Sequence, residues 1–255
     1  MLTLTAVVSV AVIAIMAVFV RMLLTPPWPA DFPQTDFVWI APGEFTMGSP
    51  DTEAGREPDE TQYRVTLSSG YWLAKYEVTQ EQWQAVMGAN PAIFATLRDP
   101  KLPIENVSWD EVQLFIKKLN AAEGTDFRLP TEAEWEYGCR AGTSAAFSFG
   151  EGNARLGECA WYKENGQTLT HPVGTKQPNA LGLYDMHGNV KEWCQDWAGP
   201  YPVGPATDPQ GPETGTARIY RGGSWGTDGA TCRSADRSFL APTKQGSDLG
   251  FRLCR

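Results

Sequence analysis

Residues 142–217 are the stretch that most restricts how this chain can fold. Helical periodicity is missing there, and Gly, Pro and Asn recur every few residues. Such a long irregular segment inside a compact domain is usually functional or held in place by a bound ion. The whole chain has 25 Gly, 19 Pro and 10 Trp. Many turns combined with large aromatic side chains predict a loop-rich α+β domain rather than a helix bundle.

An oxygen-rich turn lies within this stretch. Asp185, Asn189 and Glu192 place three oxygen-bearing side chains within eight residues. Gly188 allows a sharp turn, so that main-chain carbonyl oxygens can join them. Oxygen donors of this kind suit Ca²⁺. The alternative is a hairpin turn in which the Asp and Asn side chains cap their own backbone and Glu192 is solvated. The residues alone leave both interpretations open.

Charge and residue types narrow the possible functions. The net charge is −9, which argues against a nucleic-acid partner because such proteins carry basic patches. The chain has 2 His, too few for a site built from several imidazoles. None of the 5 Cys forms a Cys-x-x-Cys pair, so no structural zinc site is expected. The cysteines are either disulfides of an oxidising compartment or buried thiols of the cytosol.

The N-terminus predicts a membrane anchor. Residues 2–20 carry no charge and are long enough to span a bilayer as a helix. Neither a clear basic start nor a clear small-residue cleavage site is present, which favours an uncleaved anchor over residues 1–24. A Pro-rich spacer, residues 25–35, precedes the domain, residues 36–255. Arg21 follows the span and favours a cytoplasmic domain; the cysteines and the calcium-like turn favour the periplasmic or extracytoplasmic side, which we expect.

Local signals predict the regular elements of the domain. Capping boxes mark helix starts at Thr79, Ser108 and Thr131, each with Gln or Glu three residues later. The acidic segment 51–60 is expected to be an exposed loop. The last apolar run, residues 249–254, is expected to pair with the first strands and close the domain. Other strands are predicted at residues 37–40, 43–48, 63–67, 71–78 and 218–225.

Five sequence blocks together resemble the formylglycine-generating enzyme family, also called the sulfatase-modifying-factor domain. The resemblance covers residues 36–255 and implies an elaborated C-type-lectin-like α+β fold, low in regular secondary structure, with bound Ca²⁺. Carried over to this chain, the calcium ligands are side-chain oxygens of Asp185 and Glu192 and carbonyl oxygens of Gly188 and Val190. The blocks are residues 42–49, 77–83, 128–137, 182–193, and 221–225 leading to 250–252.

The family's oxidase activity depends on two copper-binding cysteines just after the Gly-Gly-Ser block. Counted forward from Ser224, Thr227 stands in the first of these positions and Cys232 in the second. Counted back from Arg237, the segment is about three residues short, and Cys232 matches neither position. Cu(I) requires soft thiolates, which a hydroxyl cannot replace. We therefore expect no copper and no formylglycine synthesis by that route, with Ser224 and Cys232 remaining as candidate catalytic residues.

Other members of the superfamily suggest different roles. Thiol oxidoreductases with non-haem iron need several His, and His171 and His187 are the only two here. Other relatives tailor an exported metabolite without the copper cysteines, or bind ligands through a variable surface that matches residues 224–244. For Arg233 and Arg237, structural ion pairs are the alternative. The candidate surface residues are Trp225, Asp228, Arg233, Asp236, Arg237 and Phe239.

The cysteines allow more than one disulfide pattern. Cys139 with Cys254, and Cys194 with Cys232, are candidate pairs. The family resemblance instead implies a bridge from Cys139 to a position close to Cys232. Cys159 is left over in both patterns and is expected to be buried.

Three functions are compatible with the sequence. The first is a membrane-anchored, extracytoplasmic maturation or tailoring factor with altered or lost copper-oxidase chemistry, acting on an exported protein or metabolite. The second is a calcium-stapled, lectin-like binding module without catalysis. The third is an active formylglycine-generating oxidase that acts on a sulfatase cysteine.

Overall fold

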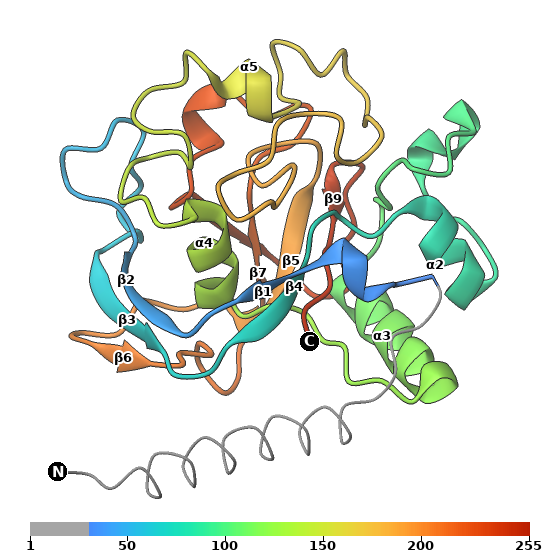
Figure 1. Ribbon diagram of the computed structural model, residues 1–255, viewed down its shortest axis with the longest axis horizontal. Coiled ribbons are helices and arrows are strands. Elements are labelled where there is room, and N and C mark those ends of the chain that lie inside the picture. Colours follow the sequence, from blue (N-terminus) through green and yellow to red (C-terminus); the bar gives the residue numbers. More distant parts are fainter. Residues whose placement is uncertain (1–30) are drawn as a thin grey trace, which may run out of the picture.

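The computed structural model describes residues 31–255 (Figure 1). The expected anchor, residues 1–24, lies outside this range, and within it no helix is long and apolar enough to cross a bilayer. The helices are α2 (Gln80–Met87), α3 (Trp109–Glu123), α4 (Glu132–Arg140) and α5 (Leu156–Cys159), with 3-10 turns η1 (Gln34–Asp36), η2 (Ile93–Leu97) and η3 (Gly229–Thr231). The strands are β1 (Phe37–Ile40), β2 (Gly43–Met47), β3 (Tyr63–Leu67), β4 (Tyr71–Ala74), β5 (Lys191–Trp197), β6 (Ala206–Thr207), β7 (Arg218–Arg221), β8 (Arg237–Leu240) and β9 (Leu249–Gly250).

The three capping boxes form as predicted. The side chains of Thr79, Ser108 and Thr131 each accept a hydrogen bond from the backbone N–H three residues later, and the Gln or Glu there bonds back. These reciprocal bonds satisfy N–H groups that a helix start otherwise leaves unpaired. Gly88 and Gly124 end α2 and α3 in the left-handed conformation. The helices therefore begin and end where local chemistry dictates.

The strands form three small sheets, which confirms the mixed α+β arrangement. Their orders are β1-β4, β2-β3-β6 and β8-β7-β5-β9. The C-terminal segment joins two of them: β9 pairs in parallel with β5, and the backbone N–H groups of Trp72 and Ala74 in β4 donate to the carbonyls of Arg255 and Leu253. The C-terminal segment closes the domain as predicted, but its partners are β5 and β4 rather than the first strands, β1 and β2.

Two features differ from the sequence expectation. β5 lies inside the stretch expected to be irregular, where it is an inner strand of the four-stranded sheet. Its burial on both faces removes the alternation that would reveal a strand. The segment 51–60 is not simply an exposed loop, because Glu60 is fully buried. Arg233 donates to both carboxylate oxygens of Glu60, at 2.7 and 2.8 Å, and anchors the segment to the domain.

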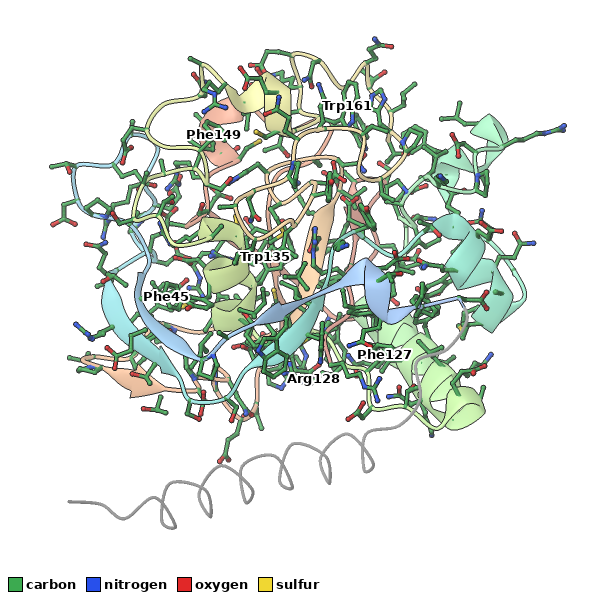
Figure 2. All side chains as sticks on the ribbon, in the orientation of Figure 1. Phe45, Phe127, Arg128, Trp135, Phe149 and Trp161 are labelled. Atoms are coloured by element: carbon green, nitrogen blue, oxygen red, sulfur yellow. The ribbon has the colours of Figure 1, made fainter. Side chains whose placement is uncertain are left out.

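Aromatic side chains fill the core between these elements. Trp83 of α2 stacks on Phe115 of α3 with ring centroids 5.1 Å apart, and Phe251 meets Phe115 edge-on. A second cluster surrounds Trp135, which projects from α4 toward β5 (Figure 2). Its indole N–H donates to Glu192 at 2.7 Å. The core thereby fixes the start of β5, where the oxygen-rich turn ends.

Candidate functional site

The oxygen-rich turn leads into β5, and its backbone conformation is one that few residue types can adopt. Asp185 and Asn189 lie in the left-handed region, with φ of 61° and 71°. A Cβ at Gly188 would collide with the carbonyl oxygen of Trp161. The Asn189 side chain holds the turn by accepting from the backbone N–H of His171 and donating to its carbonyl oxygen. Gly and Asn are therefore required by the path of the chain.

Glu77 holds the turn through two hydrogen bonds, a role that the sequence did not reveal. Its carboxylate accepts from the Asn189 side-chain amide at 2.9 Å and from the Val190 backbone N–H at 3.1 Å. The two partners lie 112 and 113 positions further along the chain, so no local pattern indicates the pairing. Glu77 lies two residues before the helix cap Thr79, a position that does not indicate which residues it contacts.

Glu192 is tightly engaged. Arg252 donates to both of its carboxylate oxygens at 2.6 Å, and Trp135 adds a third hydrogen bond. Arg252 also donates to the carbonyl oxygens of Ala74 and Tyr184. The Arg252 side chain therefore connects β5 to β4 and to the start of the turn. Both Arg252 and Glu192 are buried.

Asp185 has spare coordination capacity. Its Oδ2 accepts from the Gly174 backbone N–H at 2.7 Å, whereas Oδ1 is buried without a hydrogen-bond partner among the described residues. Burial raises its pKa to about 6. Glu77, Asp185 and Glu192 share the guanidinium of Arg252, and the Lys176 ammonium acts on Asp185 as well, so three acids face two positive charges. A cation beside Asp185 would pair the orphaned oxygen and offset the excess negative charge.

The fit to Ca²⁺ therefore differs between the expected ligands. Within residues 31–255, no group of three acidic, His or Cys side chains is arranged to hold a metal ion. Asp185 offers a free oxygen, and a site there would depend on the carbonyls of Gly188 and Val190. Glu192 could join only by sharing its oxygens with Arg252.

The hydroxyls of Ser224 and Thr227 close the turn after β7. The Ser224 backbone N–H donates to Thr227 Oγ1 at 3.0 Å, and the two hydroxyl oxygens lie 2.8 Å apart. Ser224 Oγ also donates to Asp248 at 3.1 Å, and Asp248 pairs with Lys191 at 2.8 Å. A hydrogen-bonded hydroxyl therefore lies at residue 227, which matches the family's first cysteine when the segment is counted forward from Ser224.

Cys232 is a buried thiol. Its side chain has no exposed surface, and Sγ donates to the Asp228 carbonyl at 3.5 Å. A Cβ at Gly223 would collide with Sγ, so the glycine is required for this packing. Burial raises the pKa of the thiol far above neutrality. The thiolate needed for nucleophilic attack or Cu(I) binding is thus disfavoured.

His187 lies directly beneath this turn. Its Nε2 faces the Ser148 backbone N–H at 3.1 Å, and its Nδ1 faces the Cys232 carbonyl at 2.8 Å. A backbone N–H can only donate, so Nε2 accepts and Nδ1 carries the proton. Burial lowers the pKa of His187 to about 4. The imidazole is therefore a neutral structural link between residue 148 and the Cys232 backbone.

The expected recognition surface is divided by the fold. Arg233 and Arg237 are buried, where they pair with Glu53, Glu60 and Glu132. The prediction that Arg233 and Arg237 belong to a recognition surface is therefore wrong. Their charges face buried carboxylates instead of solvent.

The other four candidates retain some exposure. Phe239 is 56% exposed, and Asp228 pairs with Lys163 at the surface. Trp225 packs edge-on against Phe94. Asp236 lines a cavity of about 410 Å³ together with Lys191, Thr227 and Ser238. Through Thr227, the cavity borders the Ser224–Thr227 turn.

The cysteines also depart from expectation. All five are buried free thiols, so the pairs Cys139–Cys254, Cys194–Cys232 and Cys139–Cys232 are absent. Two of the thiols have polar neighbours: Cys139 donates to Ser234 at 3.6 Å, and Cys194 donates to the Glu192 carbonyl at 3.9 Å. Cys254 is held by its backbone, which pairs with Arg128. Apolar packing takes the place that we expected disulfides to fill.

Comparisons with known proteins agree with this architecture. Residues 25–255 match the model of the "Sulfatase-modifying factor enzyme 1-like domain". A chaperone protein, LppX, of Paenibacillus barcinonensis is 30% identical over 243 residues, covering 75% of this chain and 81% of the relative. The formylglycine-generating enzyme of Streptomyces coelicolor is 34% identical over 212 residues, covering 76% of this chain and 64% of the enzyme.

Two solved structures share the fold at similar identity. Variable protein 1 of Treponema denticola has a TM-score of 0.76 and 34% identity, covering 86% of this chain and 94% of its own. PvdO from Pseudomonas aeruginosa has a TM-score of 0.79 and 30% identity, covering 91% and 97%.

Proposed function

Because this chain belongs to the sulfatase-modifying factor enzyme family, with its C-type-lectin-like fold, we propose that it is a maturation or tailoring factor that works without the family's copper chemistry. One observation carries the proposal. The turn after β7 contains one buried thiol, Cys232, and a hydrogen-bonded hydroxyl, Thr227, where Cu(I) would require two thiolates.

The names of the relatives are compatible with this role. One similar protein is named a chaperone, and others are formylglycine-generating enzymes. Family members thus include proteins whose names denote no oxidase. We propose that the substrate is an exported protein or metabolite, which would enter the cavity lined by Lys191, Thr227 and Asp236.

The decisive experiment is a reaction with Cu(I) and a sulfatase Cys-x-Pro-x-Arg peptide. We expect no tight Cu(I) binding and no conversion of the peptide thiol to an aldehyde. Thr227→Cys is the informative variant, because it restores a second sulfur in the family position. Aldehyde formation by the unaltered protein would contradict the proposal and reinstate the active oxidase.

We also propose that Ca²⁺ supports the domain at the oxygen-rich turn. Asp185 would contribute its orphaned Oδ1, Gly188 and Val190 their carbonyl oxygens, and Glu192 an oxygen shared with Arg252. The ion would act as a structural cross-link, supplying positive charge where buried carboxylates outnumber the guanidinium.

We further propose that residues 1–24 anchor the protein with its domain on the extracytoplasmic side. The uncharged run of residues 2–20 supports the anchor. The calcium-like turn supports the extracytoplasmic side, whereas the cysteines, which are free thiols, do not. Protease added to spheroplasts should digest the domain, whereas protease added to intact inverted vesicles should not. The reverse result would place the domain in the cytoplasm.

A lectin-like binding role remains the second candidate. It is favoured by the exposed Phe239 ring on β8, which lies within the segment 224–244 that was expected to recognise ligands. If the protein acts only by binding, Phe239→Ser should abolish partner capture while Thr227 and Cys232 variants should not. Loss of tailoring activity in the Thr227 variant would instead favour the first proposal.

A further inference from the structure

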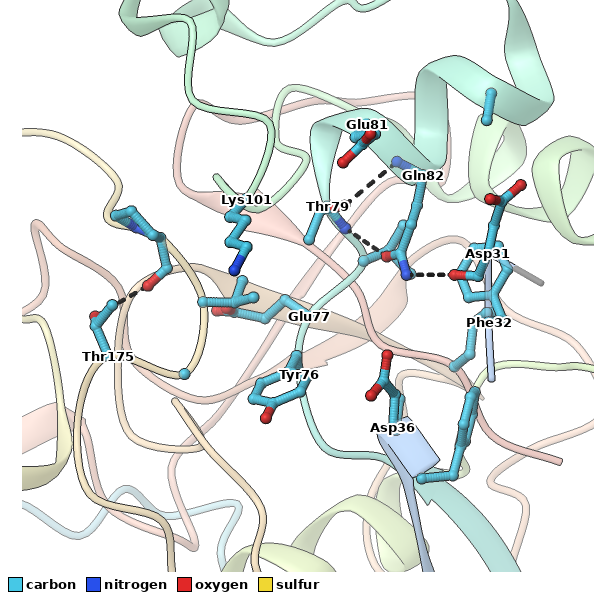
Figure 3. Close-up of a pocket in the computed structure, with 18 residues that line it drawn as sticks. Asp31, Phe32, Asp36, Tyr76, Glu77, Thr79, Glu81, Gln82, Lys101 and Thr175 are labelled. Atoms are coloured by element: carbon cyan, nitrogen blue, oxygen red, sulfur yellow. Dashed lines mark hydrogen bonds between the residues drawn. The ribbon is translucent and has the colours of Figure 1, made fainter. Parts of the chain in front are cut away.

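A second and larger cavity lies away from the Ser224–Thr227 turn. Its volume is about 680 Å³, within the range of small-molecule sites. Figure 3 shows its walls, which come from η1, the β4–α2 connection and the loop around residue 174. These three segments are far apart in sequence, so the cavity is a product of the fold.

The charged lining of this cavity is mostly acidic. Four carboxylates, those of Asp31, Asp36, Glu77 and Glu81, line it together with one ammonium, that of Lys101. Within residues 31–255, the Asp36, Glu81 and Lys101 side chains form no ion pair. Glu77 is fixed at the floor by its bonds to Asn189 and Val190. The cavity therefore offers negative charge that the described residues do not neutralise.

The remaining lining is apolar and aromatic. Phe32 and Val78 are buried beside it, and the Tyr76 ring faces the open space (Figure 3). Tyr76 packs on Tyr184 at 5.1 Å, and a Cβ at Gly174 would lie 2.5 Å from the Tyr76 ring. The ring position is thus fixed from two sides. An aromatic face beside carboxylates suits an organic cation with a hydrocarbon stem.

From this geometry we infer that the cavity binds an alkylammonium or guanidinium group on an apolar stem, as carried by a lysine or arginine side chain. The stem would pack on Tyr76 and Phe32, and the cationic end would face Asp36 and Glu81. A bare metal ion fits less well, because the carboxylates lie on separate elements and the space is much larger than an ion. The inference is independent of the proposed function.

The test uses the full-length protein in detergent, titrated calorimetrically with alanine-based pentapeptides that carry a central Lys, Arg, Nε-acetyl-lysine or norleucine. We expect the Lys and Arg peptides to bind at least tenfold more tightly than the two neutral peptides. 1,5-Diaminopentane is added as a separate arm: binding at or above the peptide's affinity would identify free amines as the source, and weaker binding would identify peptides.

Substitutions of the charged residues Asp36, Glu81 and Lys101, which form the rim of the cavity, should change the affinity in opposite directions. Asp36→Asn and Glu81→Gln should each weaken binding several-fold, and Lys101→Gln should strengthen it by removing the competing ammonium. Glu151→Gln, at an exposed acid outside the cavity, is the matched control and should have no effect. The inference is overturned if acetyl-lysine binds as well as lysine, if no cationic peptide binds at millimolar concentration, or if the rim variants behave like the control.

Discussion

His187 is the residue whose environment has the clearest thermodynamic consequence. Its two nitrogens meet one obligate donor and one obligate acceptor, so only the neutral form with a proton on Nδ1 satisfies both. Protonation of Nε2 would place two hydrogens against each other. Loss of this link would release the backbone of Cys232 and, with it, the turn that carries Thr227.

Acid should therefore destabilise the protein through His187. The ordinary pKa is 6.5 and the folded value is about 4, so the unfolded state binds the extra proton between these values. The stability that neutral His187 contributes is fully present above pH 6.5. The free energy of unfolding then falls by roughly 3 kcal/mol as the pH drops to 4. Urea unfolding of the protein and of His187→Gln at pH 7 and 4.5 should show a stability difference that shrinks in acid. Parallel pH profiles would contradict this assignment.

The glycines of the same turn provide a matched pair of substitutions. Gly223→Ala should reduce the free energy of unfolding by about 1–3 kcal/mol, because the added methyl group meets Cys232 Sγ and the His187 carbonyl. Gly226→Ala has no heavy atom within 4 Å of the new methyl group and should change stability little. If chemical denaturation shows that both substitutions lower the free energy of unfolding equally, then lost backbone freedom, not packing, determines the stability of this turn.

At the scale of elements, β5 connects the oxygen-rich turn to the core. Glu192, at its second position, is paired with Arg252 of the C-terminal segment, and neither side chain is exposed to solvent. Removing one partner leaves the other charged and buried, which typically costs about 3–5 kcal/mol. Arg252→Met should therefore destabilise more than the double variant Arg252→Met/Glu192→Leu. Additive losses in thermal unfolding would show that the pair contributes no coupling.

The turn before β5 has its own test. If Ca²⁺ binds Asp185, Asp185→Ala should lower the melting temperature more in calcium than in chelator, because the ion stabilises only the folded state. Glu151→Gln serves as the control, since this acid lies on an exposed loop. An equal decrease under both conditions would exclude an ion at Asp185.

Across the whole molecule, five thiols are distributed through the interior without a single disulfide. A maleimide reagent should label none of them rapidly in the native protein and all five after denaturation without reductant. Fewer than five labelled cysteines would show that bridges form after all. Because burial raises the pKa of Cys139 to about 12, a moderate increase in pH should not by itself make that thiol reactive.

The sequence predicted those parts of the fold that depend on neighbouring residues. Thr79, Ser108 and Thr131 mark the helix starts because a capping box needs only four consecutive positions. A structural ion pair was one of the two roles that the sequence allowed for Arg233, but its partners could not be predicted, because Glu53 and Glu60 precede it by more than 170 residues. Glu77 and His187 were missed for the same reason: their partners are brought to them by tertiary structure.

The order in which the chain is synthesised gives the segment 252–255 a particular importance. Residues 253–255 supply backbone partners for β4, and Arg252 neutralises Glu192. Both partners are synthesised long before this segment, so a nascent chain that has emerged only as far as residue 250 leaves Glu192 without its guanidinium. Folding of the domain is therefore expected to finish only after residues 252–255 have left the ribosome.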